Sequence, residues 1–129
     1  MPKTTQLTLT LESKPGVLAK VCRTLAAAGV NIDSLCAAEA GGRGKIRMVV
    51  SDPARAKEAL KGAKYRPGEE AALAVAIDDR PGTLAAVAEK LAQAKINIKC
   101  AYVTTAGGGK QTVVLTVSNP DKAQAVLGG

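Results

Sequence analysis

The sequence contains no histidine, tryptophan or phenylalanine, and its only aromatic side chains are Tyr65 and Tyr102. The lack of histidine removes the commonest metal ligand and the usual general base near neutral pH. With so few rings, the core must be built from leucine, valine, isoleucine and alanine. The composition therefore favours a protein that is not an enzyme, and we expect neither a metal nor a cofactor.

Long apolar runs are also missing, since no stretch approaches the roughly 20 apolar residues that span a bilayer. The polar start MPKTTQ does not resemble a signal peptide. The three cysteines, Cys22, Cys36 and Cys100, are odd in number and lack metal-like spacing, which favours reduced thiols over disulfides. We therefore expect a cytoplasmic protein with no membrane partner.

Acidic side chains are scarce in the first half of the chain. Residues 1–66 hold 12 Lys and Arg against 5 Asp and Glu, whereas residues 67–129 hold 6 against 6. The net charge of +7 therefore lies entirely in the first half. Such asymmetry can mark a surface that binds polyanions. The basic residues are scattered rather than clustered, however, which favours a solvated surface.

The chain does contain one long stretch that occurs twice. LTLTLESKPGVLAKVCRTLAAAGVNI covers residues 7–32, and LAVAIDDRPGTLAAVAEKLAQAKINI covers residues 73–98. A spacing of 66 aligns Pro15 with Pro81 and Asn31 with Asn97. Internal repetition indicates repeated structural units, so we expect two domains, at 1–66 and 67–129. Units of this size are marginal alone, and we expect them to pack on each other or on another chain.

Hydrophobic periodicity predicts the elements of the first unit. Alternating leucines indicate a half-buried strand, and apolar residues at i, i+3, i+4 and i+7 indicate an amphipathic helix. The expected elements are a strand at 6–12, a helix that starts at Pro15 with Ser13 near its cap and ends at Gly29, a strand from 32 to 40, a hairpin loop at 41–44, a strand at 45–51, a helix after the cap Asp52, and a short edge strand at 64–66. Residues 67–70 are expected to connect to the second unit.

The second unit is predicted to repeat this order without any fourth strand. Its expected elements are a strand at 73–78, a helix after the turn at 79–82, a strand from 98, a hairpin loop at 106–110, a strand through 113–117 and a helix after Asn119. Each unit is thus an α+β, ferredoxin-like βαββα arrangement, an antiparallel sheet with its helices on one face. Small apolar residues on the other face, such as Ala72 and Val114, lead us to expect that another unit covers part of it.

A Pro-Gly turn joins strand to helix in each repeat, with the sequences SKPG at 13–16 and DRPG at 79–82. A helix start has unsatisfied N–H donors and positive partial charge, which favour a carboxylate. Glycine allows a ligand close to the backbone, and Lys14 and Arg80 add positive charge. The asparagine that opens the next strand offers both a donor and an acceptor. These groups suit a free α-amino acid, although the same residues also make good turns without any ligand.

With this motif twice, each time followed by Asn-Ile, the chain resembles a tandem ACT-domain protein over residues 6–127. The fragments KPGVLAKV and RPGTLAAV are the most specific part of the resemblance. It implies a stand-alone regulatory protein that binds an amino-acid effector, forms a homodimer and acts on an enzyme that no motif identifies. Effectors would lie between the strand-helix turn of one domain and the second strand of another.

Carried onto this chain, the resemblance implicates the turn, the helix start and the Asn-Ile pair of each repeat. The candidate ligand-binding residues are Lys14, Pro15, Gly16, Val17, Leu18, Asn31, Ile32, Arg80, Pro81, Gly82, Thr83, Leu84, Asn97 and Ile98. Alanine at both Gly16 and Gly82 is expected to abolish binding while leaving the fold. Lys95, where the first repeat has Gly29, departs from the family pattern.

Two other classes of function were considered. Ferredoxin-like sheets can bind RNA, but they do so by stacking bases on aromatic side chains, and the predicted third strands KIRMVVS and QTVVLTVS have none. Nucleic acid is therefore not an expected partner, although an RNA-binding or protein-interaction module is the alternative. Small ferredoxin-like folds can also hydrolyse acyl phosphates with an Arg and an Asn, but nothing in the sequence places Arg43 beside Asn31.

Overall fold

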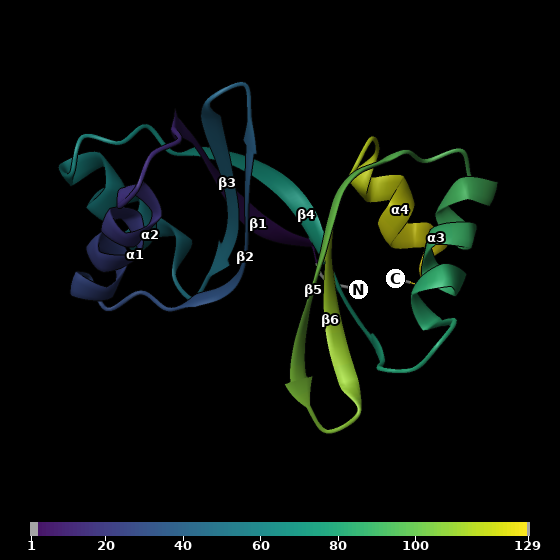
Figure 1. Ribbon diagram of the computed structural model, residues 1–129. Coiled ribbons are helices and arrows are strands. Elements are labelled where there is room, and N and C mark those ends of the chain that lie inside the picture. The colour runs from purple at the N-terminus through teal and green to yellow at the C-terminus, as the bar shows by residue number, and fades with distance from the viewer. Residues whose placement is uncertain (1–2, 129) are drawn as a thin grey trace. The chain divides into compact units, whose positions relative to one another are not determined.

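The computed structural model describes residues 3–128, which divide into two compact units (Figure 1). The N-terminal unit holds Thr5–Glu70, and the C-terminal unit holds residues 3–4 together with 71–128. Compared with the expected boundary between residues 66 and 67, the N-terminal unit gains residues 67–70 and the C-terminal unit gains residues 3–4.

The N-terminal unit is a sheet with two helices packed beside each other. Its elements are β1 (Lys3–Glu12), α1 (Val17–Ala27), β2 (Ile32–Ala40), β3 (Arg43–Val50) and α2 (Pro53–Gly62), followed by the start of β4 (Gly68–Asp78). β3 lies between β2 and β1 and is antiparallel to both. The pairings Leu7 with Met48 and Leu9 with Ile46 put alternate side chains of both strands on the face that the helices cover.

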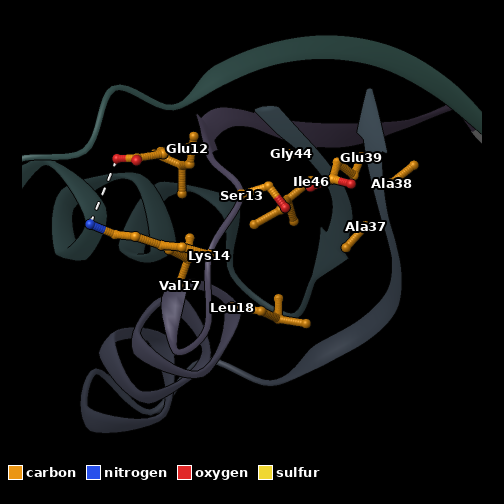
Figure 2. A pocket seen from close by; sticks show the side chains of 11 residues that line it. Glu12, Ser13, Lys14, Val17, Leu18, Ala37, Ala38, Glu39, Gly44 and Ile46 are labelled. Atoms are coloured by element: carbon orange, nitrogen blue, oxygen red, sulfur yellow. Dashed lines mark ion pairs between the residues drawn. The ribbon is translucent and has the colours of Figure 1, made fainter. Parts of the chain in front are cut away.

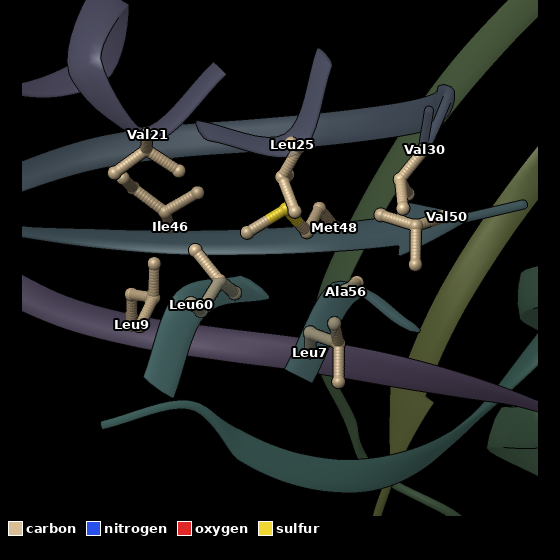
Figure 3. Packing of buried hydrophobic residues seen from close by; sticks show 10 residues of the cluster. All are labelled: Leu7, Leu9, Val21, Leu25, Val30, Ile46, Met48, Val50, Ala56 and Leu60. Carbon is tan, nitrogen blue, oxygen red and sulfur yellow. The ribbon is translucent and has the colours of Figure 1, made fainter. Parts of the chain in front are cut away.

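The core of this unit follows directly from that alternation. Leu7, Leu9, Ile46 and Met48 from the strands are buried, and α1 and α2 add their apolar stripes (Figure 3). The helix residues in this core are Val21, Leu25, Ala56 and Leu60. Their i, i+4 spacing places each pair on one side of its helix. The predicted ferredoxin-like unit, with helices on one face of an antiparallel sheet, is confirmed.

The fourth strand of the N-terminal unit begins later in the chain than the sequence predicts. Residues 64–66 are not a strand, and residues 67–70 are not merely a connection, because β4 already begins at Gly68. Glu70 accepts a hydrogen bond from the buried Gln6 at 2.8 Å, and Glu69 pairs with Lys57 of α2 at 2.8 Å. These polar contacts accompany the pairing of β4 beside β1, and no apolar period marks the residues at the start of the strand.

The C-terminal unit repeats the same arrangement with the remainder of β4. Its other elements are α3 (Thr83–Gln93), β5 (Ile98–Gly107), β6 (Lys110–Val117) and α4 (Pro120–Val126). β6 lies between β4 and β5. The second unit also has a start-of-chain segment that the sequence did not predict, since Lys3 belongs to β1 and pairs with Asp121 of α4 at 2.6 Å. Residues 3–5 are thus part of a strand.

The second helix of each unit begins as predicted. Asp52 and Asn119 are the N-caps of α2 and α4, and each side chain accepts a hydrogen bond at 3.1 Å from the backbone N–H three residues later. Pro53 and Pro120 occupy the first helical position, where no N–H is needed. The expected hairpin loops shorten to Gly41-Gly42 and Gly108-Gly109, since the strands extend further into them.

The sheet face opposite the helices in the C-terminal unit carries small and apolar side chains that are buried. Ala72 and Val114 are at most 1% exposed, and Tyr102, opposite Val114, is 9% exposed. The expectation that another unit covers this face stays a prediction. No helix within residues 3–128 is long and apolar enough to cross a membrane.

Candidate functional site

The Pro-Gly turns start their helices in a way that the sequence did not predict. α1 and α3 have Gly16 and Gly82 as N-caps, with φ of 89° and 90°, and neither cap makes a side-chain hydrogen bond to its helix. Pro15 therefore precedes the cap instead of opening the helix. The expected capping role of Ser13 is wrong for the same reason. Neither helix start has a side-chain cap, and each depends on the left-handed conformation of its glycine.

This conformation explains why each turn carries glycine. A Cβ built on Gly16 or Gly82 would meet no atom within 4 Å, so space is not the constraint. The positive φ is the constraint, because L-residues pay roughly 1–2 kcal/mol in the left-handed region. Alanine at these positions would strain the helix start, so the double alanine variant is expected to lose stability as well as binding. A binding test needs substitutions elsewhere.

A pocket of about 150 Å³ lies in the N-terminal unit beside this turn (Figure 2). It is lined by the end of β1 and the turn, by the first turn of α1, by the far end of β2 and by the start of β3. The lining residues are Leu11, Glu12, Ser13, Lys14, Val17, Leu18, Ala37, Ala38, Glu39, Gly44 and Ile46. The pocket thus contains three of the predicted residues of this repeat, Lys14, Val17 and Leu18.

The pocket combines an apolar interior with charge of both signs. Leu18 points from α1 toward β2, where Ala37 lies (Figure 2), and the buried Ile46 forms part of the lining. Lys14 pairs with Glu12 at 3.6 Å, and both side chains are more than half exposed, so the pair is weak and open to exchange. Leu18 itself is 40% exposed, about the same as its equivalent Leu84 in the second repeat, at 39%. The site can hold a small molecule with both a charged and an apolar part.

The predicted asparagines lie away from the turn of their own unit. The backbone N–H of Asn31 donates to Ser51 Oγ at 2.9 Å, at the end of β3, whereas the turn lies beside the start of β3. The Asn31 side-chain amide donates to Asp33 at 2.9 Å. α1 has 11 residues and separates Asn31 from Gly16 by roughly 16 Å at about 1.5 Å per residue. Asn97, bonded to Ser118 Oγ at 3.1 Å, occupies the equivalent place.

Ile32 and Ile98 also lie away from the turns, and they have a structural use. Each is the first residue of its strand, β2 or β5, and packs against the hydrophobic core of its unit. Pro15 and Gly16 shape the turn without lining the pocket. The structure therefore brings together one part of the predicted set and leaves the Asn-Ile pair at the other end of each unit.

The second turn holds its charges more tightly. Asp78 pairs with Lys110 at 2.5 Å and with Arg80 at 3.5 Å. The Lys110 ammonium, and to a smaller degree Arg80, lowers the pKa of this carboxyl below its ordinary value, against the opposing effect of burial. Thr83 Oγ1 donates to the carbonyl oxygens of Asp78 and Arg80, at 2.6 and 3.0 Å. Arg80 and Thr83, both predicted to bind ligand, thus have partners within their own turn.

Several pocket residues were missed by the sequence reasoning. Ala37, Ala38 and Glu39 lie at the end of β2, and Gly44 lies at the start of β3. None has a motif, and the resemblance pointed to the second strand of another domain. The hairpin could have revealed them, because a loop near residue 42 pairs residues 37–39 with the start of β3, which in turn pairs with the end of β1. Within residues 3–128, no group of three or more Cys, Asp or Glu side chains could hold a metal ion.

Comparison with known proteins agrees with this architecture. A family model described as an ACT domain pair matches residues 3–128. The structure of protein BT0572 from Bacteroides thetaiotaomicron is 34% identical in sequence, with a TM-score of 0.90 over 97% of this chain and 86% of that one. A search of proteins with curated functions finds no match. The protein belongs to the ACT-domain family, and within it the chain is a tandem pair of ACT units.

More distant structures share the fold. The regulatory subunit of aspartate kinase from Thermus thermophilus, in its ligand-free form, is 22% identical, with a TM-score of 0.70 over 95% of this chain and 87% of that one. The corresponding subunit from Thermus flavus is 20% identical, with a TM-score of 0.68 over 97% and 88% of the two chains.

Proposed function

We propose that this ACT pair is a non-catalytic regulatory module that binds a free α-amino acid in the pocket of its N-terminal unit. The observation that supports this most is the pocket itself, which lies beside a helix start and combines Lys14, Glu39 and an apolar lining. A zwitterion needs one cationic and one anionic neighbour, and its side chain needs an apolar one. In this assignment Lys14 faces the ligand carboxylate and Glu39 faces its ammonium group.

The size of the pocket favours a small ligand. A volume of about 150 Å³ corresponds to roughly five water molecules at about 30 Å³ each, whereas drug-sized ligands occupy larger cavities. Ala37, Ala38 and Gly44 contribute little side chain, so they leave room without adding specific polar contacts. An amino acid with a short apolar side chain fits this description best.

The asparagines require a second unit in this proposal. Because Asn31 lies at the opposite end of its own unit from Gly16, any site that uses both groups takes its asparagine from another unit or another copy of the chain. We propose a homodimer for this reason, with a protein target that the effector regulates. The likeness of fold to an aspartate kinase regulatory subunit supports a target in amino-acid metabolism.

The test is thermal unfolding of the purified chain against each of the twenty amino acids at millimolar concentration. A ligand that binds only the folded state stabilises it, by about 2.7 kcal/mol at a hundred times its Kd. We expect a rise with one or a few small apolar amino acids and a smaller rise in Lys14→Met. Lys20→Met, on the exposed surface of α1, is the matched control and keeps the full response. No rise with any amino acid would contradict the proposal.

RNA binding has less structural support. Sheets that bind RNA present aromatic side chains to stack on bases. The only aromatic residue in a strand is Tyr102, which is 9% exposed, and Tyr65 lies outside the strands, packed against the N-terminal core.

A further inference from the structure

The two repeats can be compared position by position through their strand registers. Gly44 pairs with Leu11 in the N-terminal unit, and Gln111 pairs with Ile77 in the C-terminal unit. On the other side of the same strands, Ala37 pairs with Ile46 and Val103 with Val113. Gly44 and Gln111 are therefore structural equivalents, and so are Ala37 and Val103.

These equivalent positions carry small residues in one unit and large ones in the other. In the N-terminal unit, Gly44 and Ala37 line the pocket. In the C-terminal unit, Gln111 is half-buried, and its Nε2 donates to the carbonyl oxygen of Asp78 at 3.5 Å, the long end of the hydrogen-bond range. The glutamine side chain thus reaches the strand end that the pocket borders in the other repeat.

The polar groups of the two turns also differ, in the partners with which they interact. Lys14 has one exposed partner at 3.6 Å, whereas Arg80 shares Asp78 with Lys110, which approaches to 2.5 Å. Val17 lines the first pocket with an apolar surface, and its equivalent Thr83 bonds to two carbonyl oxygens of its own turn. Thr83 is therefore occupied within its own turn, whereas Arg80, at 3.5 Å from Asp78 and with a 68% exposed side chain, is as accessible as Lys14.

We propose that the two repeats have separate roles: the N-terminal unit binds one amino acid per chain, and Gln111 with Val103 occupies the equivalent place in the C-terminal unit, where Leu84 and Val103 are 39% and 43% exposed. This rests on the proposed function and deepens it. The C-terminal turn then has a structural role and binds no second ligand. A chain that binds one ligand responds to its effector without cooperativity between its own repeats.

The experiment exchanges the residues between repeats and counts bound ligand by calorimetry, using the small apolar amino acid with the largest thermal shift. Gly44→Gln fills the first pocket. A Cβ at Gly44 would lie 3.9 Å from the Leu11 carbonyl oxygen, an ordinary contact, and the backbone there is not left-handed, so the variant folds. We expect one ligand per chain in the parent protein and an affinity lowered about tenfold or more, equivalent to about 1.4 kcal/mol or more, in Gly44→Gln.

The reciprocal variant, Val103→Ala with Gln111→Gly, is expected to bind a second ligand per chain. Unfolding curves without ligand check that each variant is folded. Two ligands per parent chain, or undiminished affinity in Gly44→Gln, would overturn the inference while leaving amino-acid binding intact. A reciprocal variant that still binds one ligand would show that these two side chains do not keep a ligand out of the second unit. Binding by none of the proteins would overturn the proposed function and this inference together.

Discussion

Gly29 and Lys95 end the equivalent helices α1 and α3 with the same left-handed backbone, at φ of 74° and 60°. In each case the next residue donates its backbone N–H to a leucine carbonyl in the last turn, Leu25 or Leu91, at 3.0 and 2.9 Å. The first repeat uses the residue suited to this conformation, and the second does not. The departure from the family pattern at Lys95 therefore leaves the geometry unchanged and adds strain.

Relief of that strain gives the first prediction. Lys95→Gly should raise the free energy of unfolding by about 1 kcal/mol, because glycine adopts positive φ without a steric penalty. Chemical denaturation of both proteins measures the difference. Lys90→Gly, inside α3, is the matched control and should lose about 1 kcal/mol through helix propensity. A loss of stability in both variants would show that Lys95 makes a contact that outweighs its strain.

The charge pair at the second turn predicts a pH dependence. The folded state lowers the pKa of Asp78 below 3.8, chiefly through Lys110. Its contribution to stability is therefore full above the unfolded-state pKa and is lost as pH falls through the lower folded value. Lys110→Met should raise the pKa of Asp78 in an NMR titration and flatten the acid limb of the stability curve below about pH 4. Lys99→Met, on the neighbouring strand β5, should leave that pKa unchanged.

Substitution of a core leucine should lower the stability of the fold, whereas substitution of a pocket leucine should lower ligand affinity. Leu25 is fully buried in the N-terminal core, whereas Leu18, two turns earlier on α1, is 40% exposed and lines the pocket. Leu25→Ala should destabilise the protein by about 2–5 kcal/mol through lost burial and a cavity. Leu18→Ala should change stability little and weaken the amino-acid response. The opposite pattern in unfolding and binding measurements would contradict the placement of these two side chains.

The two polar caps should contribute equally to their helices. Asp52→Ala and Asn119→Ala each remove an acceptor for an N–H in the first turn, at a cost of about 1 kcal/mol. Thermal unfolding measures both, and Glu58→Ala, at an exposed position inside α2, is a control that leaves both caps in place. A cost that appears in neither cap variant would mean that solvent replaces the side-chain acceptor without loss.

The sequence alone predicted the elements that depend on apolar periodicity. Alternation at Leu7 and Leu9, and the helical spacing of Val21 and Leu25, placed β1 and α1 and half of the core. Polar attachment is harder to predict. The start of β4 is held by Gln6 with Glu70 and by Lys57 with Glu69, and no period in the sequence marks those pairs.

The candidate site was predicted in part for a similar reason. A local motif identifies Lys14 and Leu18, because the turn that positions them is local in sequence. Ala37 and Gly44 join them only through strand pairing, and their contribution is the absence of bulk, which composition cannot signal. The φ of 89° at Gly16 favours glycine with or without a ligand, and the sequence alone does not reveal this conformation.

The strand β4 has a consequence for how the chain can be divided. Its residues 68–70 belong to the N-terminal unit, and residues 3–4 belong to the C-terminal one. A fragment that stops at residue 66 therefore lacks a strand of its own sheet, and a fragment that begins at residue 67 lacks the lysine that pairs with Asp121. Recombination or proteolysis between residues 66 and 67 therefore leaves each repeat without a short segment of its own unit.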